Sequence, residues 1–301
     1  MGLEKAYKSS GAIFEQASKL YSQGMYDRLK AIKPGEIVVV EGSYDHIQEL
    51  MKVLKVPFDY ITPTKISTHN GGRVMLVNCR TYEGGPESKA AEAVLEMVRE
   101  GGRLVTTDWA VSLVGQAFPG KVKTVGKTTD DVVEVQCLTP LSRKLIGMNY
   151  AQCHPQWWLE GSSDVYSIGQ GVEAIVTSKE MEKKYGQPYV MSGFQEGKGE
   201  VFHFISHLEL QRTKQKPKGT EKGLDAFLEK MGVPKTDDME DLDDSSVAEL
   251  EAAFSTLSTL AYMCLPGPLL KVETKSTLFT GSGNALGSKP AFGKTIKAVT
   301  P

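Results

Sequence analysis

The sequence predicts an α/β fold in which helices cover both faces of a mainly parallel sheet. A short, β-branched, all-apolar run at 37–40 has the composition typical of a strand buried on both faces, and further strand-like runs follow at 73–77 (RVMLV) and 103–107 (RLVTT). Amphipathic segments on short connections separate these runs. Alternation of this kind implies right-handed crossovers between parallel strands, and therefore one layered α/β core.

The first elements of this core follow an added N-terminal helical element. Apolar residues at helical spacing run from Leu3 to Ile32, which predicts helix over residues 1–33. Pro34 ends it, because proline disfavours helix in the residue before it. After the first strand, Ser43 is the expected N-cap of a helix through residue 55, and a second strand is predicted at 58–61.

The strand–helix pattern then repeats. The predicted elements are a strand (73–77), a glycine-rich loop (78–86), a helix (87–100), a strand (103–107) and a shorter helix (110–116). A sharp corner at Asp108 and Trp109 joins the last two elements. Since the strand at 103–107 lies between two such units, we expect it inside the sheet and not at its margin.

The pattern changes after Phe118. The predicted elements are strands at 132–138 and 172–178, a hairpin in the 193–204 region, and helices at 221–231 and 246–263. The aromatic stretch 149–168 has no clean period, whereas Ser246 and Glu249 form a capping box. The expected division is a helical element (1–33), an α/β domain (34–211), a helical segment (212–263) and an extended tail (264–301).

Composition excludes several classes of protein. The 301 residues are 40% hydrophobic and 24% charged, which is ordinary for a globular chain. With 35 basic and 37 acidic residues, the chain has no charge excess that would predict nucleic-acid binding. No apolar run approaches the roughly 20 residues of a membrane span, and the N-terminus does not resemble a signal peptide. Four scattered cysteines without a CxxC pair predict neither a disulfide framework nor a zinc ribbon, so we expect a cytoplasmic protein.

Three segments carry a resemblance to a known fold. They are VMLVNCRTYEGG, GGRLVTTDWAV and the late strand that ends in His207-Leu208-Glu209. In this order they resemble the class I glutamine amidotransferase-like fold, a flavodoxin-like sheet shared with proteins of the trehalose-utilisation type. The resemblance covers residues 35–211. It implies a catalytic cysteine at the strand-to-helix elbow and a His-x-Glu pair beside it.

The elbow departs from the pattern of the catalytic members. It carries Asp108 and Trp109, and without a thiolate a Cys-His-Glu glutaminase cannot form its thioester. His207 and Glu209 keep the His-x-Glu half. Cys79 follows a strand in the loop where the resembling enzymes place oxyanion-hole backbone, so it is either a replacement nucleophile or a small residue packed under a loop. Cys153, followed by His154, is either a second candidate or part of an aromatic insertion.

Asp108 and Trp109 each have a structural and a functional interpretation. Asp108 could cap the following helix, act as a general base or bind a cation. Trp109 could pack over the sheet edge or floor a shallow ligand pocket. No metal site is predicted, because His203 and His207 on one strand would stand about 13 Å apart. The acidic run 237–244 lacks the pattern of a calcium loop, and no nucleotide motif occurs, so no cofactor is expected.

The leading functional hypothesis is a non-catalytic amidotransferase-like domain used for binding or assembly. The partner would be another protein or a second copy of the chain, reached through the 264–301 tail, where five lysines oppose one glutamate. The alternative is a hydrolase acting on a small carbonyl or sugar-like substrate at the carboxyl edge of the sheet. Asp108, His207, Glu209 and Cys79 would line its site. Nucleic-acid binding through the lysines at 214–222 is a third, weaker possibility, because an acidic run lies just downstream.

Overall fold

The computed structural model describes most of the chain. The described residues are 2–69, 71–83, 88–137, 139–147, 155–208, 223–237, 239 and 246–270. Residues 1–270 form one compact unit, and the chain from Lys271 onward is a separate one. Among the described helices, none combines the length and apolar character that crossing a membrane requires.

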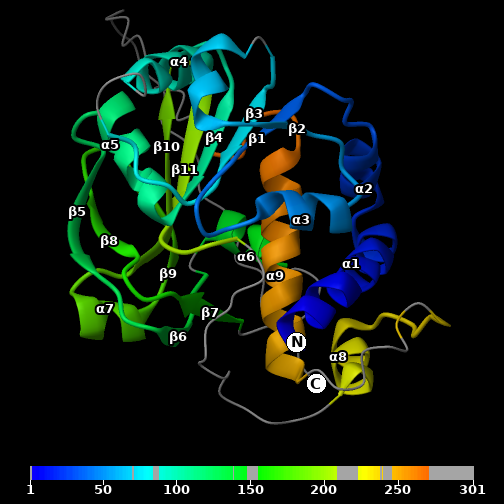
Figure 1. Cartoon of the computed structure of the whole chain (residues 1–301). Helices are drawn as coiled ribbons and strands as arrows, with labels where there is room; N and C mark the ends of the chain where they lie inside the picture. Colours follow the sequence, from blue (N-terminus) through cyan, green and yellow to red (C-terminus); the bar gives the residue numbers. More distant parts are fainter. Residues whose placement is uncertain are drawn as a thin grey trace, which may run out of the picture. The chain divides into compact units, whose positions relative to one another are not determined.

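A seven-stranded sheet forms the centre of the first unit (Figure 1). Its order is β2-β1-β3-β4-β11-β10-β9. The strands of the chain are β1 (Ile37–Val40), β2 (Asp59–Ile61), β3 (Val74–Val77), β4 (Arg103–Thr107), β5 (Val122–Lys127), β6 (Asp131–Glu134), β7 (Gln156–Leu159), β8 (Asp164–Ile168), β9 (Glu173–Thr177), β10 (Tyr189–Glu196) and β11 (Gly199–Phe204). The pairs from β2 through β11 are parallel, whereas β10 and β9 run antiparallel to their neighbours. The five parallel strands therefore have the 2-1-3-4-5 order of a flavodoxin-like sheet.

Helices lie on both sides of this sheet. They are α1 (Gly2–Tyr21), α2 (Gln23–Lys30), α3 (Ile47–Val53), η1 (Pro63–Thr68), α4 (Ser88–Arg99), η2 (Asp108–Ala110), α5 (Val111–Ala117), α6 (Pro140–Leu145), α7 (Lys179–Tyr185), α8 (Leu224–Met231) and α9 (Val247–Cys264). Figure 1 shows α4 and α5 on one side of the sheet and α3 and α9 on the other. The predicted α/β class with helices on both faces is confirmed.

The predicted central strands are confirmed. Every residue of β1, β3 and β4 is buried, as expected for strands covered on both faces. β4 lies between β3 and β11, so the strand that leads to the elbow is internal. The predicted hairpin is β10 and β11, and its second strand pairs in parallel with β4, from Glu200 opposite Arg103 to Phe204 opposite Thr107. This pairing brings the carboxyl ends of β4 and β11 together.

The N-terminal helix packs along the last described helix. Phe14 of α1 meets Phe254 of α9 with ring centroids 6.0 Å apart, and the Tyr7 hydroxyl donates to Thr256 Oγ1 at 3.5 Å. The capping box predicted at the start of α9 is present, with Ser246 Oγ accepting the Glu249 N–H. These contacts place the two ends of the described chain on one side of the sheet.

One helix start was predicted wrongly. Ser43 does not cap α3, which begins only at Ile47. The oxygen that accepts the Ile47 N–H is Asn78 Oδ1, at 2.9 Å, from the residue after β3. Because this capping residue follows a different strand, the sequence immediately before the helix does not reveal it. The residues between β1 and α3 are thus free to form a loop over the end of the sheet.

The aromatic stretch without a clean period also has regular structure. It contains β7, which pairs with β6, and β8, which pairs with β5, in two small antiparallel sheets. Trp157 and Trp158 are adjacent and both only 4% exposed, so burial does not alternate along β7. This is why the stretch lacks the period of a surface strand.

A buried ion pair fixes the chain after α9. The Arg103 guanidinium contacts Glu200 at 2.9 Å and donates to the carbonyls of Met263 and Leu265 at 2.7 and 2.8 Å. Glu200 in turn accepts the N–H groups of Leu269 and Leu270. The compact unit therefore extends to Leu270, beyond the start expected for the tail at residue 264. Residues 271–301 of that tail lie outside the described residues.

Candidate functional site

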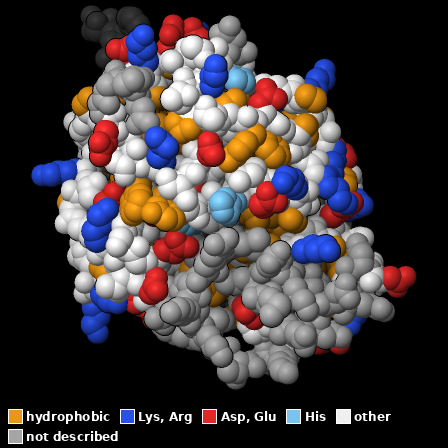
Figure 2. All heavy atoms as spheres, in the orientation of Figure 1, with side chains coloured by type: hydrophobic (Ala, Val, Ile, Leu, Met, Phe, Trp, Pro, Cys, Tyr) orange, Lys and Arg blue, Asp and Glu red, His pale blue; other side chains and the backbone are white. Residues whose placement is uncertain are grey.

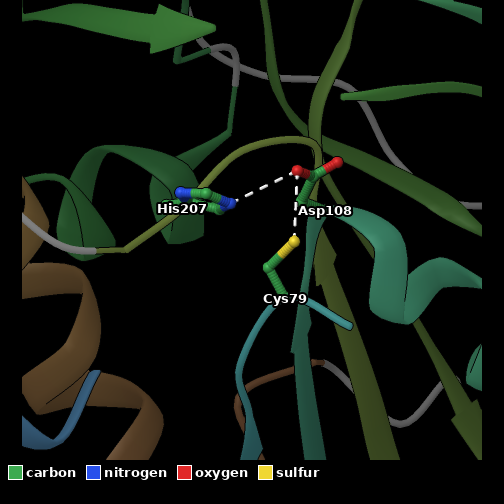
Figure 3. A group of neighbouring side chains, drawn as sticks. All are labelled: Cys79, Asp108 and His207. Carbon is green, nitrogen blue, oxygen red and sulfur yellow. Dashed lines mark hydrogen bonds and ion pairs between the residues drawn. The ribbon is translucent and has the colours of Figure 1, made fainter. Parts of the chain in front are cut away.

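Three side chains converge at the carboxyl edge of the sheet (Figure 3). Cys79 follows β3, Asp108 follows β4 and His207 follows β11, and these three strands are neighbours. One donor atom of each lies within 4.8 Å of the others. Open α/β sheets bind ligands at this edge, so the arrangement brings three of the four predicted candidates to one place. Glu209, the fourth, lies outside the described residues.

Asp108 lies at the centre of this group. Its Oδ2 is 3.4 Å from Cys79 Sγ and 3.3 Å from His207 Nε2, while its Oδ1 accepts the backbone N–H of Asp164 at 3.1 Å. Its φ is +44°, a left-handed conformation that costs a non-glycine residue energy and is often found at functional sites. The interpretation of Asp108 as a helix cap is wrong, because no side chain caps η2 or α5. Its carboxylate is directed at Cys79 and His207 instead.

A further carboxylate contacts His207 from the opposite side. Glu160 Oε2 lies 2.7 Å from His207 Nδ1, so the imidazole bridges Asp108 and Glu160. Glu160 was not predicted from the sequence; it follows β7 in the stretch without a clean period. The available signal was weak: an acidic residue directly after two tryptophans, at the end of a strand that was not recognised.

Asp45 fixes the backbone around the three side chains. It is 1% exposed, and its carboxylate accepts the Cys79 N–H and the Thr107 hydroxyl, both at 2.5 Å. The loop that carries it approaches Cys79 closely, because a Cβ at Gly42 would lie 2.7 Å from the Cys79 carbonyl oxygen. The sequence analysis missed Asp45, whose partners come from two other strands. Asp45 therefore connects the loop after β1 to the loop after β3 and to the end of β4.

Burial and hydrogen bonds shift the pKa of each of these groups. Burial raises the pKa of the Cys79 thiol to about 12 and the pKa of Asp45 to about 6. Burial alone would lower the pKa of His207, but hydrogen bonds to Asp108, Cys79 and Glu160 raise it well above its ordinary value. At neutral pH the thiol is therefore protonated, and the imidazole carries positive charge among carboxylates.

The three side chains are closed to solvent. Cys79 is 0%, His207 2% and Asp108 3% exposed. A crevice beside His207, lined in part by Trp157, has room for about one water molecule. Trp109 is half-buried at the surface near the elbow, where its indole N–H donates to the Ser162 carbonyl and its ring meets Tyr44 edge-on. Trp109 thus packs against neighbouring loops and does not line this crevice.

The other candidates lie elsewhere. His203 is buried in β11 and is 2.9 Å from Thr106 Oγ1, and burial lowers its pKa to about 3. It does not join His207 in a shared group. Cys153, His154 and the lysines at 214–222 lie outside the described residues, as does most of the acidic run 237–244.

This arrangement defines the class of protein. It is an α/β protein with flavodoxin-like strand order, whose elbow carries a buried aspartate bound to a cysteine and a histidine. A hydrolase would require these three side chains to converge, as they do. Their burial is compatible with a domain that has no catalytic activity. The same Cys, Asp and His set offers one thiol, one carboxylate and one imidazole as metal ligands.

Comparisons with known proteins add little to this description. No family model matches the sequence, and no curated protein matches it. A glutamine amidotransferase from Methylobacillus flagellatus is 12% identical, with a TM-score of 0.48 over 78% of this chain and 96% of that chain. One from Thermotoga maritima is 11% identical, with a TM-score of 0.46 over 76% and 97% of the two chains.

A GH42 beta-galactosidase from G. stearothermophilus is 14% identical, with a TM-score of 0.37 over 57% of this chain. This chain covers only 27% of that enzyme's length. Because all three TM-scores are below 0.5, these similarities carry no argument about activity. The fold assignment depends on the strand order and not on these comparisons.

Proposed function

We propose that this chain is a non-catalytic, amidotransferase-like domain that acts by binding or assembly, as a homo-oligomer or within a protein complex. The observation that supports the proposal is the state of the elbow. Asp108 occupies the position of the expected nucleophile, and its carboxylate is held by Asp164, Cys79 and His207. A thioester cannot form on a carboxylate, and the neighbouring thiol is buried and protonated.

Surface charge supports a protein partner over a nucleic acid. On the face shown in Figure 2, acidic and basic side chains are interspersed over the described surface. The net charge of −2 agrees with this mixture. The proposal assigns the assembly role to the tail beyond Leu270, whose lysines would bind an acidic surface. The cysteines at 79, 137 and 264 form no disulfide, in keeping with a cytoplasmic location for the domain.

The experiment has two readouts on the purified full chain. The first is ammonia release from glutamine, which we expect to be absent. The second is the molar mass by light scattering, which we expect to exceed one chain and to fall on truncation after Leu270. Ammonia release that is lost in Cys79→Ala would overturn the non-catalytic part. A full-length protein that is monomeric and captures no partner through its tail would overturn the assembly part.

A second candidate function is a hydrolase acting on a small carbonyl or sugar-like substrate. One observation favours it: a carboxylate (Asp108), an imidazole (His207) and a second carboxylate (Glu160) lie side by side in that spatial order, with separations of 3.3 and 2.7 Å. Nucleophile, base and orienter occur in this order in many hydrolases. Closure of the site argues against it, because any substrate larger than water requires the loops to open.

The two candidates are distinguished by hydrolysis of p-nitrophenyl esters and p-nitrophenyl glycosides. The hydrolase predicts a rate that is lost in Asp108→Asn and kept in Asp164→Asn. Asp164 is a suitable control because its side chain pairs with Lys127, while only its backbone N–H contacts Asp108. A rate equal in all three proteins, at the level of buffer, favours the binding domain.

A further inference from the structure

We propose that Cys79, Asp108 and His207 bind a divalent transition-metal ion, with Zn²⁺ the best fit, and that Glu160 orients His207 for this role. This inference does not depend on the function proposed above. Metal binding would explain why these three polar side chains are clustered and buried even if the domain has no catalytic activity.

Two of the three separations between donor atoms match those of a tetrahedral site. With ordinary zinc-to-ligand distances, two ligand atoms of a tetrahedron lie about 3.5 Å apart for sulfur and oxygen and about 3.3 Å apart for nitrogen and oxygen. Here Cys79 Sγ is 3.4 Å from Asp108 Oδ2, and His207 Nε2 is 3.3 Å from the same oxygen. Cys79 Sγ and His207 Nε2, the third pair, lie within 4.8 Å of each other, so the three atoms are close enough to share one ion.

The donor set selects among metals. Thiolate and imidazole are ligands for zinc and other late transition metals, whereas magnesium and calcium prefer oxygen. One sulfur, one nitrogen and one oxygen favour Zn²⁺ over the hard cations. Three protein ligands leave one tetrahedral position, which a water molecule or a small ligand would fill.

Surrounding groups hold each donor in place. Glu160 contacts His207 Nδ1 at 2.7 Å and leaves Nε2 directed at the site, which is the carboxylate–histidine arrangement found behind many zinc ions. Asp108 uses Oδ1 for the Asp164 N–H, so Oδ2 remains for the ion. The Cys79 backbone is fixed by its N–H, which Asp45 accepts. All three ligands are thus oriented by contacts that do not involve a metal.

Carboxylates lie close to the proposed ligands on more than one side. Asp108 Oδ2 is 3.3 Å from His207 Nε2 and Glu160 Oε2 is 2.7 Å from His207 Nδ1, while the buried Asp45 accepts the Cys79 N–H. Carboxylate oxygens bind and orient metal ligands in zinc sites, so these surroundings suit a divalent cation.

The test uses the full chain, stripped with a chelator and then supplied with Co²⁺ or Zn²⁺. We expect one zinc per chain by elemental analysis. We also expect the cobalt-bound protein to show thiolate-to-cobalt charge-transfer absorption, with the intense visible bands of tetrahedral cobalt. Glu160→Gln should keep this absorption and weaken metal affinity about 10- to 100-fold. Cys79→Ser should lose the charge-transfer band.

A variant in which Cys137, Cys153 and Cys264 are all replaced by serine leaves Cys79 as the only thiol. It is the control for a Cys79→Ser protein that fails to fold. The proposal predicts that this variant keeps the charge-transfer absorption and the one-to-one stoichiometry. Absence of the band in both this variant and the wild-type chain would overturn the proposal. A band present in the wild type but lost in this variant would also overturn it, since another cysteine would then be the ligand.

Discussion

Substitution of Arg103 by methionine tests the buried ion pair that connects β4, β11 and the residues after α9. The Arg103 and Glu200 side chains are 6% and 5% exposed and contact each other at 2.9 Å. The same guanidinium donates to the carbonyls of Met263, Leu265 and Gly267. Arg103→Met keeps most of the side-chain length but leaves the Glu200 carboxylate buried without its cation.

The expected magnitude follows from this loss. Removal of one partner from a buried pair costs about 3–5 kcal/mol, because the remaining charge stays desolvated. For a domain of this size, about 2–4 °C of thermal midpoint is lost per kcal/mol. Arg103→Met should therefore unfold at least about 6 °C, and more typically 10 °C or more, below the wild type.

Arg99→Met is the matched control. Arg99 pairs with Glu196 at 2.9 Å between the same pair of chain regions, but its side chain is 58% exposed. Exposed pairs contribute about 0–1 kcal/mol, so this variant should unfold within a few degrees of the wild type. Differential scanning calorimetry measures both proteins. Equal midpoints for Arg103→Met and Arg99→Met would show that burial does not make the Arg103–Glu200 pair more stabilising than the exposed pair.

Three further predictions test other parts of the structure. Truncation after Leu270 should leave the thermal midpoint nearly unchanged, whereas truncation after Cys264 should lower it by several degrees because Arg103 and Glu200 lose partners; calorimetry that finds equal midpoints would contradict this. Gly42→Ala should cost about 1–3 kcal/mol in urea unfolding, since its Cβ would lie 2.5 Å from Asn78 Cβ, and an unchanged midpoint would argue against the close approach of these loops. Burial lowers the pKa of His203 from 6.5 to about 3 in the folded chain. Between these two pH values the unfolded chain binds a proton at His203 and the folded chain does not, so the free energy of unfolding falls as pH decreases below about 6.5. The stability difference between wild type and His203→Gln should then shrink on acidification, and urea unfolding at pH 7 and pH 4.5 that finds a constant difference would contradict it.

The buried strands could be predicted from the sequence because their signal is local. In β1 and β3 every residue is apolar, and burial on both faces needs no information from the rest of the chain. The position of Asp108 followed directly, since the end of β4 fixes where the elbow lies. The capping box of Ser246 and Glu249 is equally local, with its two members three residues apart.

The rest of the site depends on contacts between distant segments. Glu160 and Asp45 are single acidic residues in loops, and their importance appears only when folding brings His207 and Cys79 beside them. The cap of α3 comes from Asn78, 31 residues after Ile47, so a search next to the helix selected Ser43. Asp108 was placed correctly, but one of its three interpretations, a local role as a helix cap, was wrong. Its partners lie on other strands.

The proposed non-catalytic function requires Cys79, beside the Asp108 elbow, to be a buried and protonated thiol. Native alkylation tests it most directly. The folded chain, stripped of metal by a chelator, is treated with iodoacetamide at neutral pH, and each cysteine is then located by peptide mass mapping. We expect Cys79 to stay unmodified in the folded protein and to react fully after unfolding in urea, because it is 0% exposed and burial raises its pKa to about 12. Rapid stoichiometric alkylation of Cys79 in the folded protein, slowed by His207→Gln, would contradict the claim and identify an activated nucleophile.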